Sequence, residues 1–124
     1  MKSKDKKTVV IGASAKPFRF SYSAVVELNR NSIPVEAIGL RKDSIEDIEI
    51  QTGNPSITDT HTVTMYVGPK NQAAYIDYII NELKPKRIIF NPGTENDEFE
   101  ALAKENGIEV IKDCTLKMLA FKAF

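Results

Sequence analysis

The sequence has one cysteine, one histidine and no tryptophan among its 124 residues. A single cysteine, Cys114, cannot form a disulfide within the chain, and it cannot supply the several thiolates of a cysteine-built zinc site. A single histidine, His61, likewise excludes a metal centre built from several histidines of one chain. We therefore expect a fold that depends on apolar packing, without disulfides and without a metal site.

Long apolar runs and an excess of charge of one sign are also missing. No stretch of ~18 apolar residues occurs, so no transmembrane helix is expected. Lysines precede the apolar residues 9–13, but this run is shorter than the ~7–15 apolar residues of a secretory signal. Seventeen Lys and Arg balance seventeen Asp and Glu, which argues against binding to nucleic acid or anionic membrane. We expect a cytoplasmic protein in a reducing environment.

The sequence does contain a regular alternation of short apolar runs with stretches of helical periodicity. The apolar runs are rich in β-branched residues, as in strands buried on both faces, and they lie at residues 8–12, 35–40, 62–67, 87–90 and 108–111. Helical spacing of apolar residues follows at residues 22–28, 71–83 and 99–103. A short edge strand at residues 48–50 and a last helix after Asp113 are also expected.

This alternation predicts one α/β domain over residues 8–124, preceded by a flexible polar tail over residues 1–7. Strands that alternate with helices usually become parallel strands joined by right-handed crossovers. We therefore expect a Rossmann-like, doubly wound, mainly parallel sheet of five to six strands with helices on both faces. At the helix ends we expect Ser21 and Thr94 as N-caps, Asp97 as the capping-box partner of Thr94, and Gly107 at a C′ position.

In an open α/β sheet, ligands bind beyond the carboxyl ends of the strands. The sequence places five loops there, at residues 12–21, 39–42, 67–70, 91–94 and 113–115. A binding site, if the protein has one, is expected to be assembled from these loops.

The first of these loops has the chemistry of a phosphate site. Gly12, Ala13 and Ser14 are small, so a bulky anion can approach the backbone. Lys16 and Arg19 add positive charge, and the start of the following helix offers free N–H groups and the positive end of its dipole. The loop therefore predicts binding of a phosphate or diphosphate.

Two common nucleotide-binding motifs do not fit this loop. The pattern G-x-G-x-x-G would place Ser14 and Pro17 at its second and third glycines, and the Walker pattern lacks a second glycine before Lys16. A loop between a strand and a helix also favours small and polar residues without any ligand, and this alternative stays open.

The second loop distinguishes between cofactors. NAD-binding sheets usually carry a carboxylate at this point, which accepts a hydrogen bond from the ribose hydroxyl. Here Gly39 and Leu40 are followed by Arg41 and Lys42, which would attract a phosphate instead. The loop therefore favours a phosphorylated ribose, as in NADP or coenzyme A, over NAD. The alternative is a solvated basic turn at the edge of the sheet.

Three segments carry a resemblance to a known family. They are Val10-Ile11-Gly12-Ala13-Ser14 with Arg19 and Ser21-Tyr22, then Asn91-Pro92-Gly93-Thr94-Glu95-Asn96, and finally Asp113-Cys114-Thr115-Leu116-Lys117-Met118. Over nearly the whole chain, the sequence resembles the small stand-alone CoA-binding proteins, which share a domain with the N-terminal part of the succinyl-CoA synthetase alpha subunit. The resemblance implies a Rossmann-like fold that binds the 3′-phospho-ADP part of coenzyme A, or of an acyl-CoA, across the strand ends.

The resemblance also implies roles for individual residues. The diphosphate would contact the first loop, and Arg41 would contact the 3′-phosphate or the ribose. Asn91 and Thr94 would line the far side of the cleft. The residues expected to bind the cofactor are Gly12, Ala13, Ser14, Lys16, Arg19, Phe20, Ser21, Gly39, Leu40, Arg41, Tyr66, Val67, Gly68, Pro69, Asn91, Pro92, Gly93 and Thr94.

Neither His61 nor Cys114 is expected to be catalytic. His61 precedes a predicted strand and so belongs to the edge away from the ligand, out of reach of a reacting atom. Cys114 follows a strand and lies on the ligand side, where a packed, inert thiol is the ordinary interpretation. The alternative for Cys114 is a thiol of lowered pKa that forms a mixed disulfide with CoA.

We therefore expect a small-molecule binding protein rather than an enzyme. Two alternatives stay open. One is a small enzyme that uses NADP or another nucleotide. The other is a ligand-free interaction module, which would form a homodimer or bind a partner enzyme through an apolar tail made of Leu119, Ala120, Phe121 and Phe124.

Overall fold

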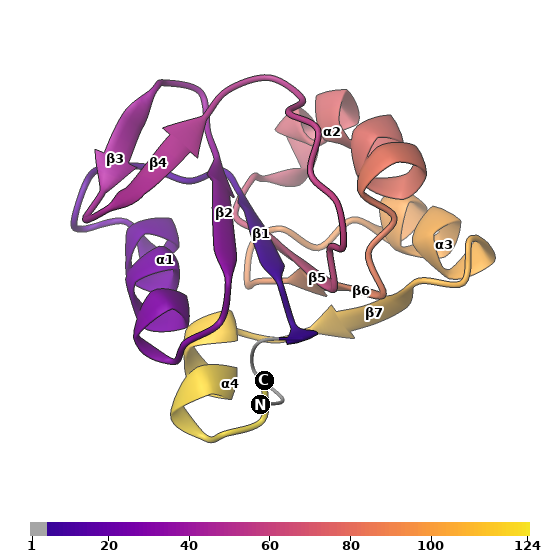
Figure 1. Cartoon of the computed structure of the whole chain (residues 1–124). Coiled ribbons are helices and arrows are strands. Elements are labelled where there is room, and N and C mark those ends of the chain that lie inside the picture. Colours follow the sequence, from indigo (N-terminus) through magenta and orange to yellow (C-terminus); the bar gives the residue numbers. More distant parts are fainter. Residues whose placement is uncertain (1–4) are drawn as a thin grey trace.

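Strand β1 (Thr8–Ile11) forms the centre of a seven-stranded sheet in a computed structural model that describes residues 5–124 (Figure 1). The other strands are β2 (Val35–Ile38), β3 (Asp43–Ile45), β4 (Ile48–Gln51), β5 (Thr62–Met65), β6 (Arg87–Phe90) and β7 (Glu109–Lys112). Their order in the sheet is β3-β4-β2-β1-β5-β6-β7. Only β3 is antiparallel to its neighbour.

The parallel strands have the order of a doubly wound fold. Strand β1 pairs with β2 on one side and with β5 on the other, and all four of its residues are buried. Without β3, the remaining six strands follow the Rossmann order, so the predicted fold class is confirmed. The chain reverses direction across the sheet between β1 and β5, and a crevice for a ligand belongs at the carboxyl ends of these two strands.

The sheet has one strand more than the five to six expected. Strand β3 forms a hairpin with β4, in which Asp43 pairs with Ile50 and Ile45 pairs with Ile48. The turn between them places Glu46 at a φ of 55°. In β3 only Ile45 is buried, and a three-residue strand with one apolar residue has no periodicity that the sequence could reveal.

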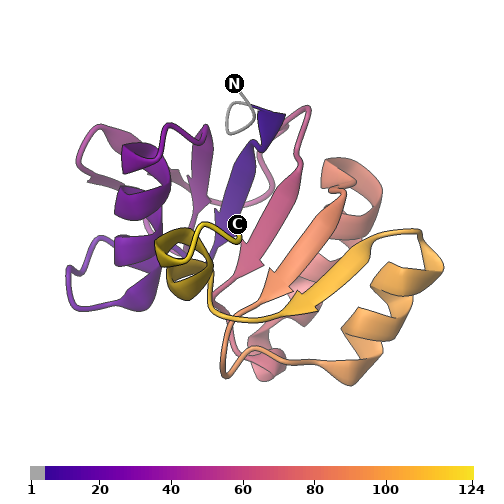
Figure 2. The same cartoon turned by 90° about the horizontal axis from the view of Figure 1, so that it is seen from below.

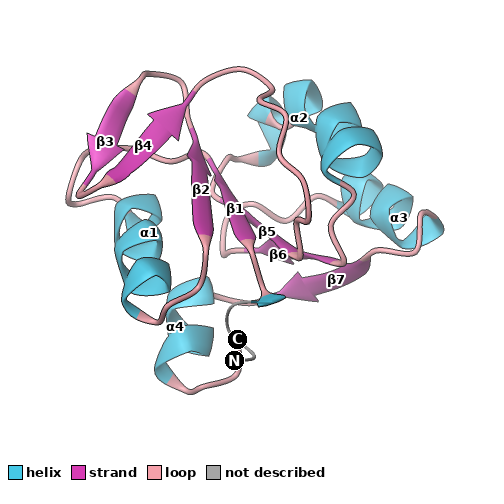
Figure 3. Ribbon diagram, viewed as in Figure 1, coloured by secondary structure: helices cyan, strands magenta, loops and turns pink. Residues whose placement is uncertain are grey.

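Helices cover the sheet on both faces (Figures 2 and 3). Helix α1 (Phe20–Arg30) and helix α4 (Thr115–Ala120) pack on one face, where Val10 belongs to the same core cluster as Val25 and Leu28. The other face carries α2 (Ala73–Asp77), which continues into the π-helical η3 (Tyr78–Leu83), and α3 (Asp97–Glu105). There Val9 packs in a second cluster with Phe99. Neighbouring valines of β1 thus point to opposite faces, as the period of a strand requires.

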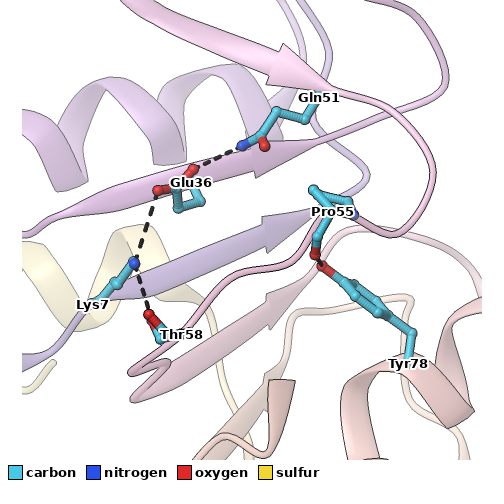
Figure 4. Close-up of polar contacts among 6 residues, drawn as sticks. All are labelled: Lys7, Glu36, Gln51, Pro55, Thr58 and Tyr78. Atoms are coloured by element: carbon cyan, nitrogen blue, oxygen red, sulfur yellow. Dashed lines mark hydrogen bonds and ion pairs between the residues drawn. The ribbon is translucent and has the colours of Figure 1, made fainter. Parts of the chain in front are cut away.

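The connection from β4 to β5, residues 52–61, contains neither helix nor strand and crosses the sheet as an irregular loop (Figure 1). Figure 4 shows two contacts that hold this connection: the Tyr78 hydroxyl donates to the carbonyl of Pro55 at 2.6 Å, and Lys7 Nζ donates to the carbonyl of Thr58 at 3.0 Å. Lys7 also lies 4.0 Å from a carboxylate oxygen of Glu36. Burial, more than the nearby carboxylates, raises the pKa of Tyr78 to about 12. The phenol therefore keeps the proton that it donates to this connection.

Helix α1 begins differently from the prediction. Its N-cap is Arg19, without a side-chain cap, and Ser21 lies inside the helix and is buried. The reason is a turn in which the Arg19 N–H donates to the carbonyl of Lys16 at 3.0 Å, with Pro17 at its second position. This turn leads the chain into helical geometry before Ser21 is reached, so the prediction of Ser21 as an N-cap was wrong.

The N-cap of α3 also differs from the prediction. Asn96, not Thr94, is the N-cap, and its side chain accepts from the Phe99 N–H at 3.2 Å. The carboxylate of Glu100, not of Asp97, accepts from the Asn96 N–H at 2.9 Å. The Thr94 hydroxyl is already used, because it closes the preceding turn.

The predicted C-terminus of the same helix is confirmed. Gly107 has a φ of 75°, and its N–H donates to the carbonyl of Lys104 while the N–H of Ile108 donates to the carbonyl of Ala103. These two bonds form a Schellman motif, in which glycine is favoured at C′.

The C-terminal segment packs back on the amino edge of the sheet. Phe124 joins the core cluster under α1, and its ring lies 4.5 Å from the guanidinium of Arg87. The Lys6 ammonium donates to the carbonyl of Phe124, so the described part of the predicted N-terminal tail contacts the domain. Residues 1–4 of that tail lie outside the described residues. Phe121 is exposed, whereas Leu119 is partly buried in the same cluster.

His61 provides a test of this amino edge. Its pKa is lowered by desolvation and by the positive charges of Arg87, Lys6 and Lys86. In the unfolded chain the imidazole takes up a proton near pH 6.5, whereas the folded protein takes it up only at lower pH. The free energy of unfolding should therefore fall as the pH decreases from about 7 through this interval. Urea unfolding at pH 7.5 and 5.5 measures this change in the free energy of unfolding. In His61→Gln, the change between the two pH values should be smaller than in the original protein. An equal difference in both proteins would contradict this assignment.

Candidate functional site

Three loops meet at the carboxyl end of β1, and two glycines make this possible. A Cβ atom on Gly12, which has a φ of 95°, would lie 2.8 Å from Cγ2 of Val67 and 3.0 Å from the carbonyl of Tyr66. A Cβ atom on Gly39 would lie 2.3 Å from the carbonyl oxygen of Ala13. Because no side chain fits at either position, the loops after β1, β2 and β5 lie in direct contact. Three of the five predicted loops thus meet at this point.

Hydrogen bonds to β2 decide which amides of the first loop are free. The N–H groups of Gly12 and Ala13 both donate to the carbonyl of Ile38 at 2.9 Å. These two donors hold the loop in place and are not available to a ligand. In the described part of the chain, the N–H groups of Ser14 and Ala15 have no protein acceptor. The free N–H donors of this loop therefore begin at Ser14, two residues after Gly12.

The start of α1 supplies further donors. Within residues 5–124 the N–H groups of Phe20 and Ser21 have no acceptor, and the helix dipole places partial positive charge at this end. Between the two sets of donors, the Lys16 N–H donates to Oγ of Ser14 at 3.1 Å. That bond leaves the hydroxyl hydrogen of Ser14 free to donate to a ligand.

Cations and exposed apolar side chains surround these donors. Lys16, Arg19, Arg41 and Lys42 are exposed, and none of them forms an ion pair with a described residue. The Arg19 guanidinium lies 5.5 Å from the centre of the Phe18 ring. Three apolar side chains of the same two loops are largely exposed, namely Phe18, Phe20 and Leu40.

The loop after β5 is uncharged up to Pro69. The hydroxyl of Tyr66 is buried without a hydrogen-bond partner among the described residues. Desolvation, and to a lesser extent Cys114, raises the pKa of Tyr66. Val67 contacts the first loop, as described above, whereas Gly68 and Pro69 are exposed. This loop therefore offers mainly backbone and apolar surface to a ligand.

In the loop after β6, the polar side chains serve the fold. The Asn91 amide donates to Oγ1 of Thr64 and to the carbonyl of Met65, and its oxygen accepts from the Thr115 N–H. The Thr94 hydroxyl donates to the carbonyl of Asn91 at 2.8 Å. Asn91 and Thr94 are both buried, and the hydrogen bonds of their side chains are made inside the protein. The exposed residues of this loop include Pro92 and Gly93, for which a lining role stays a prediction.

One residue of this region was missed by sequence reasoning. Gln72 is fully buried and donates to the carbonyls of Val67 and Thr94. It thus joins the loop after β5 to the loop after β6. A glutamine at the start of a predicted helix carries no signal in the sequence that would mark it as buried.

The histidine and the cysteine lie at opposite edges of the sheet. His61 precedes β5 at the amino edge, where its Nδ1 is 2.7 Å from Oγ1 of Thr62. Cys114 is the N-cap of α4 at the carboxyl edge and is partly buried. Its N–H donates to the carboxylate of Asp113 at 2.7 Å. The predicted placement of both residues is confirmed.

The surface has two shallow depressions, one beside the loop after β2 and one at the amino edge of the sheet. One, of about 710 Å³, runs along β3 and β4 and includes Lys42, Gln51 and Pro55. The other, of about 540 Å³, lies at the amino edge and includes His61 and Lys86. The first loop lines neither of them. Among residues 5–124, no three His, Cys, Asp or Glu side chains lie together as metal ligands, and no helix is long and apolar enough to cross a membrane.

The contact between Gly39 and the first loop can be tested by substitution. In Gly39→Ala, the new methyl group must displace the carbonyl of Ala13, which should lower the free energy of unfolding by about 1–3 kcal/mol. Gly68→Ala is the matched control, because a Cβ atom there meets nothing within 4 Å and the φ of −65° suits alanine. Urea unfolding measures both. Equal stability of the two variants would refute the close packing of these loops.

Several solved structures have the same fold, and each of them matches most of this chain. The crystal structure of an uncharacterized protein is 41% identical in sequence with a TM-score of 0.92, and the match covers 96% of this chain and 98% of that chain. A hypothetical protein from Pyrococcus horikoshii OT3 is 24% identical, with a TM-score of 0.78 over 90% and 80% of the two chains. The cell-free protein ID.343 from Thermus thermophilus is 20% identical, with a TM-score of 0.82 over 96% and 90%. The last two similarities show the fold alone.

A comparison with models of protein families relates the chain to a family by its sequence. No curated protein matches the chain. The model described as a CoA binding domain matches residues 6–120, which includes all the loops at the carboxyl edge. The chain therefore belongs to the CoA binding domain family.

Proposed function

We propose that this protein binds coenzyme A, or an acyl-CoA, without transforming it. The observation that carries the proposal is the meeting of three loops at the carboxyl end of β1, where Gly12 and Gly39 bring backbone donors and unpaired cations together. Membership in the CoA binding domain family supports the same ligand. A nucleotide with several phosphates matches this set of groups in charge and in hydrogen bonding.

The diphosphate fits the first loop. The free N–H groups of Ser14 and Ala15, the hydroxyl of Ser14 and the start of α1 are all donors. Lys16 and Arg19 neutralise the charge. Because Gly12 and Ala13 are hydrogen-bonded to β2, the loop is already held in position before a ligand arrives, which lowers the entropic cost of binding.

The 3′-phosphate fits the loop after β2. Arg41 is exposed there beside Lys42, and a guanidinium can bind a phosphate through two parallel hydrogen bonds. This loop contacts the first loop through Gly39 and Ala13, so one nucleotide can reach both. NADP also carries a phosphate on its ribose, and the test below separates the two cofactors.

A binding role without catalysis is consistent with the placement of the titratable groups. His61 lies at the amino ends of the strands, whereas the proposed site lies at their carboxyl ends. At the carboxyl edge, Tyr66 keeps its proton because burial raises its pKa. We therefore assign no catalytic residue in this proposal.

Ligand affinities test the proposal. Calorimetry should show binding of CoA, weaker binding of dephospho-CoA, and weak or no binding of NADP and ADP. In Arg41→Ala, the loss of a charge-assisted contact should weaken CoA binding by about tenfold or more, while dephospho-CoA binding should be almost unchanged. Lys104→Ala, which removes an exposed cation of α3, is the control and should bind CoA as the original protein does.

The outcomes are distinct. If the protein binds no CoA at millimolar concentration, the proposed function is wrong. If CoA and dephospho-CoA bind equally well, the site holds, but Arg41 is not the partner of the 3′-phosphate. Tighter binding of NADP than of CoA would favour a nucleotide-dependent enzyme instead.

A further inference from the structure

The charge along the carboxyl edge is divided between two sides, and this division orients the ligand. The cations Lys16, Arg19, Arg41 and Lys42 belong to the loops after β1 and β2. On the other side, the exposed residues of the loops after β5 and β6 include the uncharged Gly68, Pro69, Pro92 and Gly93, one cation and three carboxylates. The charged residues are Lys70, Glu95, Asp97 and Glu98.

This division assigns the two ends of CoA. With the diphosphate at the end of β1 and the 3′-phosphate at the end of β2, the remaining part of the molecule must leave on the side of β5 and β6. That part is the pantetheine arm, which is uncharged and contains amides. The carboxylates of this side disfavour the phosphates, whereas its uncharged residues 68–69 and 92–93 fit the arm, and this step rests on the proposed function.

Gln72 holds this second side together. Its side chain is fully buried, and its amide nitrogen donates to the carbonyl of Val67 at 2.8 Å and to the carbonyl of Thr94 at 2.7 Å. Its amide oxygen accepts from Nδ2 of Asn96 at 3.0 Å. One side chain therefore joins the loop after β5 to the loop after β6 through both loop backbones.

The loop after β6 is in turn fixed to the sheet. The N–H and the hydroxyl of Thr94 both donate to the carbonyl of Asn91. Asn91 donates to the carbonyl of Met65 at the end of β5. The first loop does not need Gln72, because Gly12 is bonded to Ile38 of β2.

We propose that Gln72 is a positioning residue for CoA: by joining the loops after β5 and β6, it sets the surface along which the pantetheine arm lies. Gln72 itself does not touch the ligand. Its removal should therefore weaken the binding of the pantetheine half of CoA and leave the nucleotide half unaffected.

The experiment compares two ligands in calorimetry: CoA, and adenosine 3′,5′-bisphosphate, which lacks the pantetheine arm and the second phosphate of the diphosphate. In Gln72→Met, which keeps the length of the side chain but has no amide, CoA should bind about tenfold more weakly. The affinity for adenosine 3′,5′-bisphosphate should change less than about twofold. Tyr78→Phe is the control, because it removes a partly buried hydrogen bond elsewhere in the fold and should change neither affinity.

A second variant keeps the test decisive if Gln72→Met does not fold. In Asn96→Ser, the serine can still cap α3, but it is too short to reach Gln72, and the same selective loss of CoA affinity is expected. If CoA binds the original protein and the variants weaken both ligands equally, or neither, the inference about Gln72 is wrong while the proposed function holds. If the original protein binds no CoA, the proposed function itself has failed.

Discussion

The contact between the backbones of three loops at the end of β1 is the constraint on which the rest of the site depends. Gly12 and Gly39 have no side chains, so the loops after β1, β2 and β5 approach more closely than any other residue would allow. The same approach lets the carbonyl of Ile38 accept from two N–H groups of the first loop. As a result, the later amides of that loop and the start of α1 are left without protein partners, although the loop itself is held firmly.

The strand order explains why the two halves of this edge differ. The chain runs from β1 outward to β2 and β4 in one direction, and from β5 outward to β7 in the other. Loops from the first half carry the cations Lys16, Arg19, Arg41 and Lys42, whereas the loops after β5 and β6 are held by buried amides, chiefly Gln72 and Asn91. Most buried polar groups are hydrogen-bonded, and these amides find their partners in the loop backbones, in β5 and in the side chains of Thr64 and Asn96. Their role is therefore to shape a surface, while the exposed cations can bind anions.

Several features followed from the sequence because they depend on residues close together in the chain. The β-branched runs of β1 and β6 and the C′ glycine at position 107 are local signals, and the structure has each of them. Local reasoning was wrong at the helix N-termini. Ser21 and Thr94 are both suitable caps, but a turn at Lys16 starts α1 earlier, and the hydroxyl of Thr94 is used by the carbonyl of Asn91.

By itself, the sequence determined the Rossmann-like order of elements, the loops that end at one edge of the sheet, and the small and basic residues of the first two loops. Periodicity and composition are properties of neighbouring residues, which is why they could be recognised. Only the tertiary structure decided which polar groups of those loops have partners within the protein and which are left free. In the folded protein, the amides of Gly12 and Ala13 and the side chain of Asn91 form internal hydrogen bonds, and Gln72 is buried between two loops. Such partners lie far apart in the chain, and a hydrogen bond between them leaves no pattern in the sequence.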